Sequence, residues 1–203
     1  MRTLRIVLAS LLLVAGCSSA EPGEPTVGDA TTSTTTDRTD EPTGTSESTE
    51  TGTSVDRPRE IDLKAVDICQ VVAKLPLKSY GLDGDRAPLG GDSTIFPGSK
   101  ECFANGIEKN LSLTLVAVTN EGAESFVESA NADITSGEAA GFPLAVLKLA
   151  QPANCFGVLD VHDGQFIYVS YGLSNPAEQP ATPQDQLCRT VSTIATATIG
   201  ALG

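Results

Sequence analysis

The chain of 203 residues has few basic residues, a single histidine and no long apolar run. Lysine and arginine number 13 against 26 aspartates and glutamates, so the formal net charge is −13. So acidic a protein repels phosphate backbones and anionic head groups, which argues against nucleic acid as a partner. The cysteines form no closely spaced pair and the one histidine is far from them, which argues against a metal site. We therefore expect no cofactor and no metal.

The N-terminal apolar run extends from Ile6 to Val14 and is about half as long as a membrane-spanning helix requires. Two arginines precede it and small residues follow it, which is the pattern of a secretory signal peptide over residues 1–16. Cys17 comes directly after Gly16, and the stretch Val14 to Cys17 resembles the bacterial lipobox. The alternative is a plain secretory signal with an incidental cysteine.

A lipobox predicts that the thiol of Cys17 receives a diacylglyceryl group and that the mature protein carries two or three acyl chains, such as palmitate. Two or more acyl chains hold a protein stably at a membrane, whereas one does not. The sequence therefore predicts a lipoprotein on the outer, extracytoplasmic face of the cytoplasmic membrane, with the membrane itself as a partner through Cys17.

Residues 17–60 are rich in threonine, serine, proline, glycine and acid and contain no aromatic residue. Such a segment cannot bury enough apolar surface to offset its ordering entropy, so we expect a disordered tether. The threonine cluster at 31–36 leaves open a second use, as a site of O-linked sugar.

Residues 61–203 form the predicted folded domain, which is large enough to bury its own core. Hydrophobic periodicity and turn residues predict an α+β fold in which N-terminal, middle and C-terminal helices sandwich an antiparallel sheet of about five strands. Thr182 is the predicted N-cap of the last helix and Pro183 its first residue. The expected helices are at 66–73, 121–131 and 183–202, the expected strands at 100–105, 111–118, 142–149, 154–161 and 165–171, and short strand pieces at 94–96.

Five cysteines are an odd number, and lipid on Cys17 would leave an even set of four for disulfides outside the cytoplasm. Four cysteines allow three pairings, and sequence alone does not choose among them. Two of the four lie on predicted helices and two in or beside predicted strands. Matching helix to helix and strand to strand predicts Cys69 with Cys188 and Cys102 with Cys155.

Two further features are candidates for chemistry. His162 is the only group whose ordinary pKa lies near neutrality, but no nucleophile motif surrounds it, so a solvated turn histidine is the main interpretation. Asp83-Gly84-Asp85 begins like a calcium loop, but Ala87 and Thr94 stand where further ligands are needed, which favours a flexible loop. We identify no catalytic residue.

Several of these features occur together in one known family. The lipobox, the threonine-rich spacer, Asp67-Ile68-Cys69 on the first helix, Cys102 at a strand start, Asn154-Cys155 and the helix near Cys188 resemble the actinobacterial lipoproteins described as domain of unknown function 3558. That family usually has proline where Ile68 stands and a tryptophan after the second cysteine. The element order is also similar to the Mog1/PsbP-like sandwich, which implies a fold and no activity.

Both faces of the hairpin around Asp163-Gly164 are apolar, which is one further feature of functional interest. Helices covering both sides of the sheet explain the pattern, while a partly open apolar cavity is the alternative. Because the predicted anchor displays the domain at the membrane surface and no catalytic motif is found, we expect a non-enzymatic domain that binds an envelope protein or a cell-wall partner. The alternative is a carrier of an apolar ligand such as a lipid, and an enzyme is the third possibility.

Overall fold

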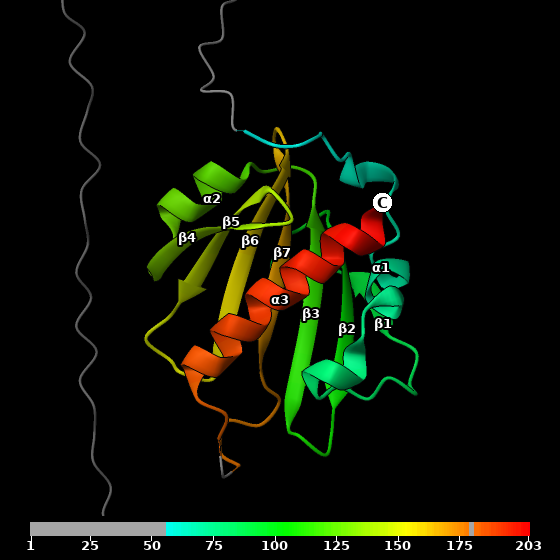
Figure 1. Cartoon of the computed structure of the whole chain (residues 1–203), viewed down its shortest axis with the longest axis vertical. Helices are drawn as coiled ribbons and strands as arrows, with labels where there is room; N and C mark the ends of the chain where they lie inside the picture. Colours follow the sequence, from blue (N-terminus) through cyan, green and yellow to red (C-terminus); the bar gives the residue numbers. More distant parts are fainter. Residues whose placement is uncertain (1–55, 179–180) are drawn as a thin grey trace, which may run out of the picture. The chain divides into compact units, whose positions relative to one another are not determined.

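One antiparallel sheet organises the part of the chain that the computed structural model describes, residues 56–178 and 181–203 (Figure 1). The predicted signal peptide, Cys17 and the tether up to residue 55 lie outside the described residues. The sheet has seven strands in the order β1-β2-β3-β7-β6-β5-β4. The strands are β1 (Leu89–Asp92), β2 (Lys100–Gly106), β3 (Leu111–Val118), β4 (Asp133–Ala139), β5 (Phe142–Lys148), β6 (Asn154–His162) and β7 (Gln165–Leu173).

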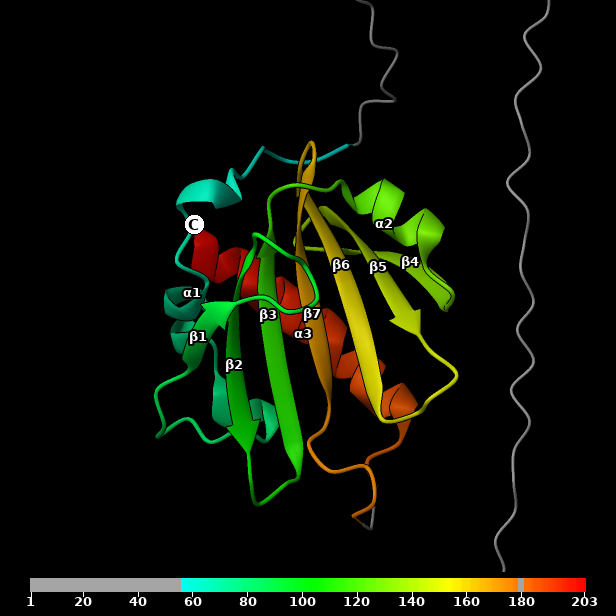
Figure 2. The same cartoon turned by 180° about the vertical axis from the view of Figure 1, so that it is seen from behind.

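Helices cover the two faces of this sheet unequally. The long helix α3 (Gln184–Leu202) crosses one face diagonally with α1 (Ile68–Lys74) beside it, as Figure 1 shows. The other face carries the short α2 (Ala123–Ser129), and in Figure 2 the segment between β1 and β2 crosses in front of β3 and β7. Two short 3₁₀ helices, η1 (Leu63–Ala65) and η2 (Leu77–Tyr80), flank α1 along the chain.

Alternation along the strands explains why both faces are apolar. In β3, Leu113 and Leu115 belong to the larger core under α1 and α3, whereas Val116 and Val118 belong to a smaller core on the other side. The smaller core is aromatic: the ring of Phe96 lies 5.1 to 5.6 Å from the rings of three neighbours, which are Phe126, Phe166 and Tyr168. The predicted covering of both faces is confirmed.

The predicted α+β class and antiparallel sheet are confirmed, but the strand number of about five is wrong. The sequence analysis missed β4, because six of its seven residues are exposed and no alternation of apolar and polar residues marks it. It also predicted short strands at 94–96, whereas the strand in this part of the chain is β1, which ends at Asp92. The cap of α3 is Pro183 rather than Thr182, and the helix begins at Gln184.

Among the helices within 56–178 and 181–203, none has the length and apolar character needed to cross a bilayer.

Candidate functional site

The segment that leads into the domain is fastened to the tip of the β6–β7 hairpin. The side chain of Arg57 is only 5% exposed and is surrounded by carboxylates. Its Nε donates to Asp160 at 3.0 Å, its Nη2 donates to Asp163 at 2.7 Å, and its Nη1 donates to Glu60. We call Arg57, Glu60, Asp160, His162 and Asp163 the hairpin cluster.

The contacts inside the hairpin cluster change the pKa values of its carboxyl groups. Burial raises the pKa of Asp160, and the attraction of Arg57 opposes that rise. The hydrogen bond from Arg57 lowers the pKa of the exposed Asp163 carboxyl. Each of the three guanidinium nitrogens donates to a carboxylate of the domain, so this cluster serves as a structural clamp.

His162, the candidate singled out by its chemistry, belongs to this cluster. Its Nδ1 lies 2.8 Å from the carbonyl oxygen of Asp163 and 3.7 Å from a carboxylate oxygen of Glu60. Its side chain is one-third exposed, so the histidine is less solvated than the sequence analysis predicted. Beside it, the backbone N–H of Asp163 donates to Glu60, and no serine or cysteine of the described chain bonds to the histidine ring.

Two disulfides join helices to the strands beneath them. Cys69 on α1 bonds to Cys102 on β2, and Cys155 on β6 bonds to Cys188 on α3, each with a Cα–Cα distance of 5.1 Å. A Cβ added at Gly90 would lie 2.9 Å from the sulfur of Cys69, so the glycine makes room for the first disulfide.

The predicted pairing of Cys69 with Cys188 and of Cys102 with Cys155 is therefore wrong. The sheet order places β3 and β7 between the strands of Cys102 and Cys155, so the two strands lie roughly 14 Å apart. A disulfide needs Cα atoms within about 7 Å. Each helical cysteine instead meets the strand on which its helix packs.

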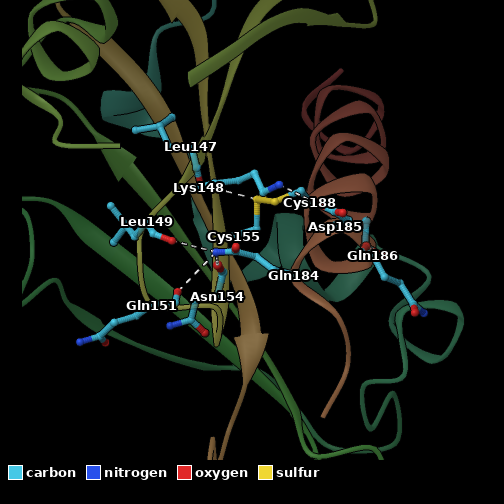
Figure 3. Close-up of a disulfide and its surroundings, with 11 residues drawn as sticks. Leu147, Lys148, Leu149, Gln151, Asn154, Cys155, Gln184, Asp185, Gln186 and Cys188 are labelled. Carbon is cyan, nitrogen blue, oxygen red and sulfur yellow. Dashed lines mark hydrogen bonds and ion pairs between the residues drawn. A yellow bond between two sulfur atoms is a disulfide. The ribbon is translucent and has the colours of Figure 1, made fainter. Parts of the chain in front are cut away.

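The start of α3 is fixed by several contacts around the second disulfide, as Figure 3 shows. The side-chain amide of Gln184 donates to the carbonyl oxygens of Leu149, Gln151 and Asn154 at 3.0 to 3.3 Å. Lys148 pairs with Asp185 and lowers the pKa of that carboxyl. Gln186 points to the other side of the helix, away from Gln184 and the disulfide.

On that other side lies a cavity of about 400 Å³, which we call the lysine groove. It is formed by η2, the β2–β3 turn and the start of α3. Its lining residues are Lys78, Ser79, Tyr80, Gly81, Lys109, Leu111, Tyr171, Thr182, Gln186 and Thr190. Among the described residues, hydroxyls, one amide and two ammonium groups therefore surround it, and no acid lines it.

The predicted loop Asp83-Gly84-Asp85 lines a neighbouring cavity of about 520 Å³. Lys78, Gly81 and Lys109 border both cavities. Asp85 pairs with Lys78 at 2.9 Å and raises the pKa of that lysine, while Asp83 accepts from the backbone of Ile107. Over the described ranges, no group of three or more histidine, cysteine or acidic side chains is placed to hold a metal ion.

The lysine groove and the hairpin cluster lie at opposite ends of the sheet (Figure 1). Leu111 at the groove begins β3, whereas Val118 ends β3 and pairs with Phe166 beside the hairpin tip. Seven residues of extended chain span roughly 23 Å. The groove is thus far from the point where residues 56–60 join the domain.

Sequence reasoning missed most residues of these two regions, and Arg57, Lys109 and Gln186 matter most for their function. Arg57 was assigned to the tether, although its position shortly before Ile61, where the predicted folded domain begins, could have indicated a contact with the domain. Lys109 and Gln186 carried no signal, because a lone turn lysine and a lone helix glutamine occur on most protein surfaces.

Comparison with known proteins places these features in one family. A family model described as a protein of unknown function (DUF3558) matches residues 12–201. No curated protein and no solved structure matches the chain. The predicted membership of this family is confirmed over nearly the whole domain, whereas the predicted lipoprotein character stays a prediction.

Proposed function

We propose that this chain, which belongs to the DUF3558 family, is a lipid-anchored envelope lipoprotein whose folded part is a non-enzymatic binding domain. Its partner would be a protein or a component of the cell wall. The observation that carries the proposal is the lysine groove, an open polar cavity at the end of the sheet opposite the residues that lead in from the N-terminus. A binding site in that place lies at the end of the domain remote from residues 56–60, where the proposed tether joins it.

The proposed location is the outer face of the cytoplasmic membrane, with lipid on Cys17 and residues 17–60 as a spacer. Two disulfides support a place outside the cytoplasm, because reducing conditions keep cytoplasmic thiols free. The spacer would let the domain reach partners beyond the head groups. The Mog1/PsbP-like likeness stays a prediction about the fold and adds nothing to the function.

Lipid anchoring is tested with Cys17→Ser in a bacterial host fed a labelled palmitate analogue. The unchanged chain is expected to take up label and to sediment with membranes, whereas the variant takes up none. Label retained by Cys17→Ser, or absent from the unchanged chain, would contradict the proposed anchor.

Binding is tested by sedimenting the full chain, in detergent, with envelope fragments from the bacterium that encodes it. Gln186→Trp puts a bulky ring into the lysine groove and is expected to abolish co-sedimentation. Thr193→Trp is the matched control, because Thr193 is an exposed residue of the same helix outside the groove lining. Equal loss in both variants, or loss in neither, would remove the groove from the proposal.

The carrier of an apolar ligand is the second candidate, and one cavity favours it. A cavity of about 260 Å³ lies between α2 and strands β4 to β6, and its lining is largely apolar, including Val127, Leu144, Ala145 and Val158. This volume is below the roughly 300 to 1,000 Å³ of typical small-molecule sites, so a whole lipid needs α2 to move. Native mass spectrometry of the Cys17→Ser chain decides: a co-purified apolar ligand supports the carrier, and a clean mass opposes it.

A further inference from the structure

We infer that the lysine groove binds a saccharide that carries a negative charge, such as a sugar phosphate or a sugar acid. The inference rests on the proposed binding function and names the chemistry of its ligand. A charged glycan and the head group of a glycolipid both present this chemistry, namely an anion next to several hydroxyls.

The charge of the groove differs from that of the protein around it. The whole chain carries −13, yet the groove lining contains two lysines and no acid. Lys78 forms an ion pair with Asp85, which lines the neighbouring cavity. The ammonium of Lys109 makes no ion pair or hydrogen bond within the part of the chain that the structure describes, so its charge is available to a ligand.

Neutral donors surround that charge. The hydroxyl of Thr182 and the side-chain amide of Gln186 have no hydrogen-bond partner among the described residues. The hydroxyls of Ser79 and Thr190 donate to backbone carbonyls and keep their oxygens free to accept. This mixture of donors and acceptors matches the hydroxyls of a sugar, whereas a bare phosphate ion needs only donors.

The floor of the groove is apolar and rigid. Leu111 and Tyr171 are buried, and the hydroxyl of Tyr171 donates to the carbonyl oxygen of Tyr80 at 2.6 Å, which fixes the ring. Apolar and aromatic surface beside polar groups is the usual lining of a small-molecule site, and the volume of about 400 Å³ fits one or two sugar rings. The second disulfide and Gln184 hold the wall that α3 provides.

The test is a titration of the full chain in detergent micelles, followed by amide NMR at neutral pH. The probes are glucose 6-phosphate, glucuronic acid, glucose and inorganic phosphate. Both charged sugars are expected to shift the signals of Lys109, Gln186 and Thr190, and to bind about ten-fold more tightly than glucose or phosphate. Equal binding of phosphate and glucose 6-phosphate, or of glucose and glucose 6-phosphate, would overturn the inference, as would the absence of shifts.

The matched variants are Lys109→Gln and Lys64→Gln. Both lysines are exposed, but Lys64 lies on η1 and outside the groove lining. Lys109→Gln is expected to weaken glucose 6-phosphate binding about ten-fold, while Lys64→Gln leaves it unchanged. An equal effect of the two substitutions would show attraction by general charge and overturn the assigned site.

Two more probes identify the source of the ligand. Binding of polygalacturonate supports a glycan polymer, and binding of phosphatidylcholine vesicles only when they contain phosphatidylinositol supports a lipid head group. Co-sedimentation with envelope fragments that depends on Gln186, together with no response to any saccharide probe, refutes the saccharide but keeps the binding domain. If the chain neither co-sediments with envelope fragments nor responds to any saccharide probe, both the binding function and the saccharide ligand are refuted.

Discussion

The main cation at one end of the sheet is buried and paired, whereas the main cation at the other end is exposed and, among the residues that the structure describes, unpaired. At the hairpin cluster, Arg57 is almost fully buried and each of its nitrogens meets a carboxylate. At the lysine groove, Lys109 and the Gln186 amide are exposed and have no partner within the described ranges. The contrast teaches that one small domain can use one cation to hold its chain in place and leave another available to a ligand. Substitutions at the two ends should therefore affect different properties.

The largest expected effect comes from removing the disulfide that holds the groove wall. Cys155→Ser with Cys188→Ser is expected to lower the free energy of unfolding by about 4 kcal/mol, because the unfolded chain regains its loop entropy. Amide hydrogen exchange should rise most over 184–190, at the groove, and least at the hairpin. Chemical denaturation and hydrogen exchange measure the two effects.

The other disulfide is a matched control, because both bonds close loops with a sequence separation of 33. Removal of Cys69 and Cys102 should cost a similar free energy, since chain entropy depends on loop length. It should leave exchange at 184–190 at the level of the unchanged protein. Faster exchange there in this variant would mean that the groove wall depends on the whole core rather than on its own disulfide.

The next effect in size belongs to the hairpin cluster. Arg57→Met leaves the buried carboxylate of Asp160 without its cation, and we expect a loss of about 2 to 3 kcal/mol of unfolding free energy at neutral pH. Arg59→Met is the control, since Arg59 is exposed and belongs to no ion pair in the described chain; its cost should stay below about 0.5 kcal/mol. Binding at the groove should be unchanged in both.

The pH dependence of stability sharpens the same comparison. Arg57 lowers the folded-state pKa of Asp163, so the stability from Asp163 is present above its ordinary pKa of about 3.9 and is lost as the pH falls through the folded value. The raised pKa of Asp160 has the opposite sign: its contribution is present in acid and is lost as the pH rises. Without Arg57, the attraction that opposes the rise at Asp160 disappears and its pKa rises further.

The stability difference between the unchanged protein and Arg57→Met should therefore be largest near pH 7 and should shrink as the pH falls through the folded-state pKa values of the two carboxyls, first that of Asp160 and then that of Asp163. Thermal unfolding across this range measures it. A difference that stays constant with pH would show that Arg57 acts through packing of its aliphatic stem and not through its charge.

The sequence predicted best the parts of the molecule that alternate or repeat. Strand β3 was found because Leu111, Leu113 and Leu115 alternate with polar residues, and α3 because Val191 and Ala195 recur at the period of a helix. Strands β6 and β7 were found because two apolar runs flank the turn residues Asp163-Gly164. Edge strand β4 escaped because an exposed strand needs no apolar pattern. Apolar residues alternate along a strand only where one face of the strand is buried, and almost all of β4 is exposed.

Features that depend on the order of strands in the sheet could not be predicted from the sequence. The cysteine pairing failed because nothing in the local pattern says that β3 pairs with β7, and this neighbourhood separates Cys102 from Cys155. The lysine groove likewise combines residues from η2, from a hairpin turn and from α3. Each is unremarkable by itself, and only their meeting in space makes a candidate site.

The smallest expected effect on stability is the most informative about the groove. Lys109→Gln removes a charge that has no partner within the described chain and keeps the aliphatic stem that packs beside Gly81. Its unfolding free energy should stay within about 0.5 kcal/mol of the unchanged protein, although its affinity for a charged sugar falls. Substitution of a cation that stabilises the fold, such as Arg57, would lower the unfolding free energy and leave the affinity for a charged sugar unchanged. A clear loss of stability in Lys109→Gln would therefore make Lys109 a structural residue, and the two ends of the sheet would no longer differ in kind.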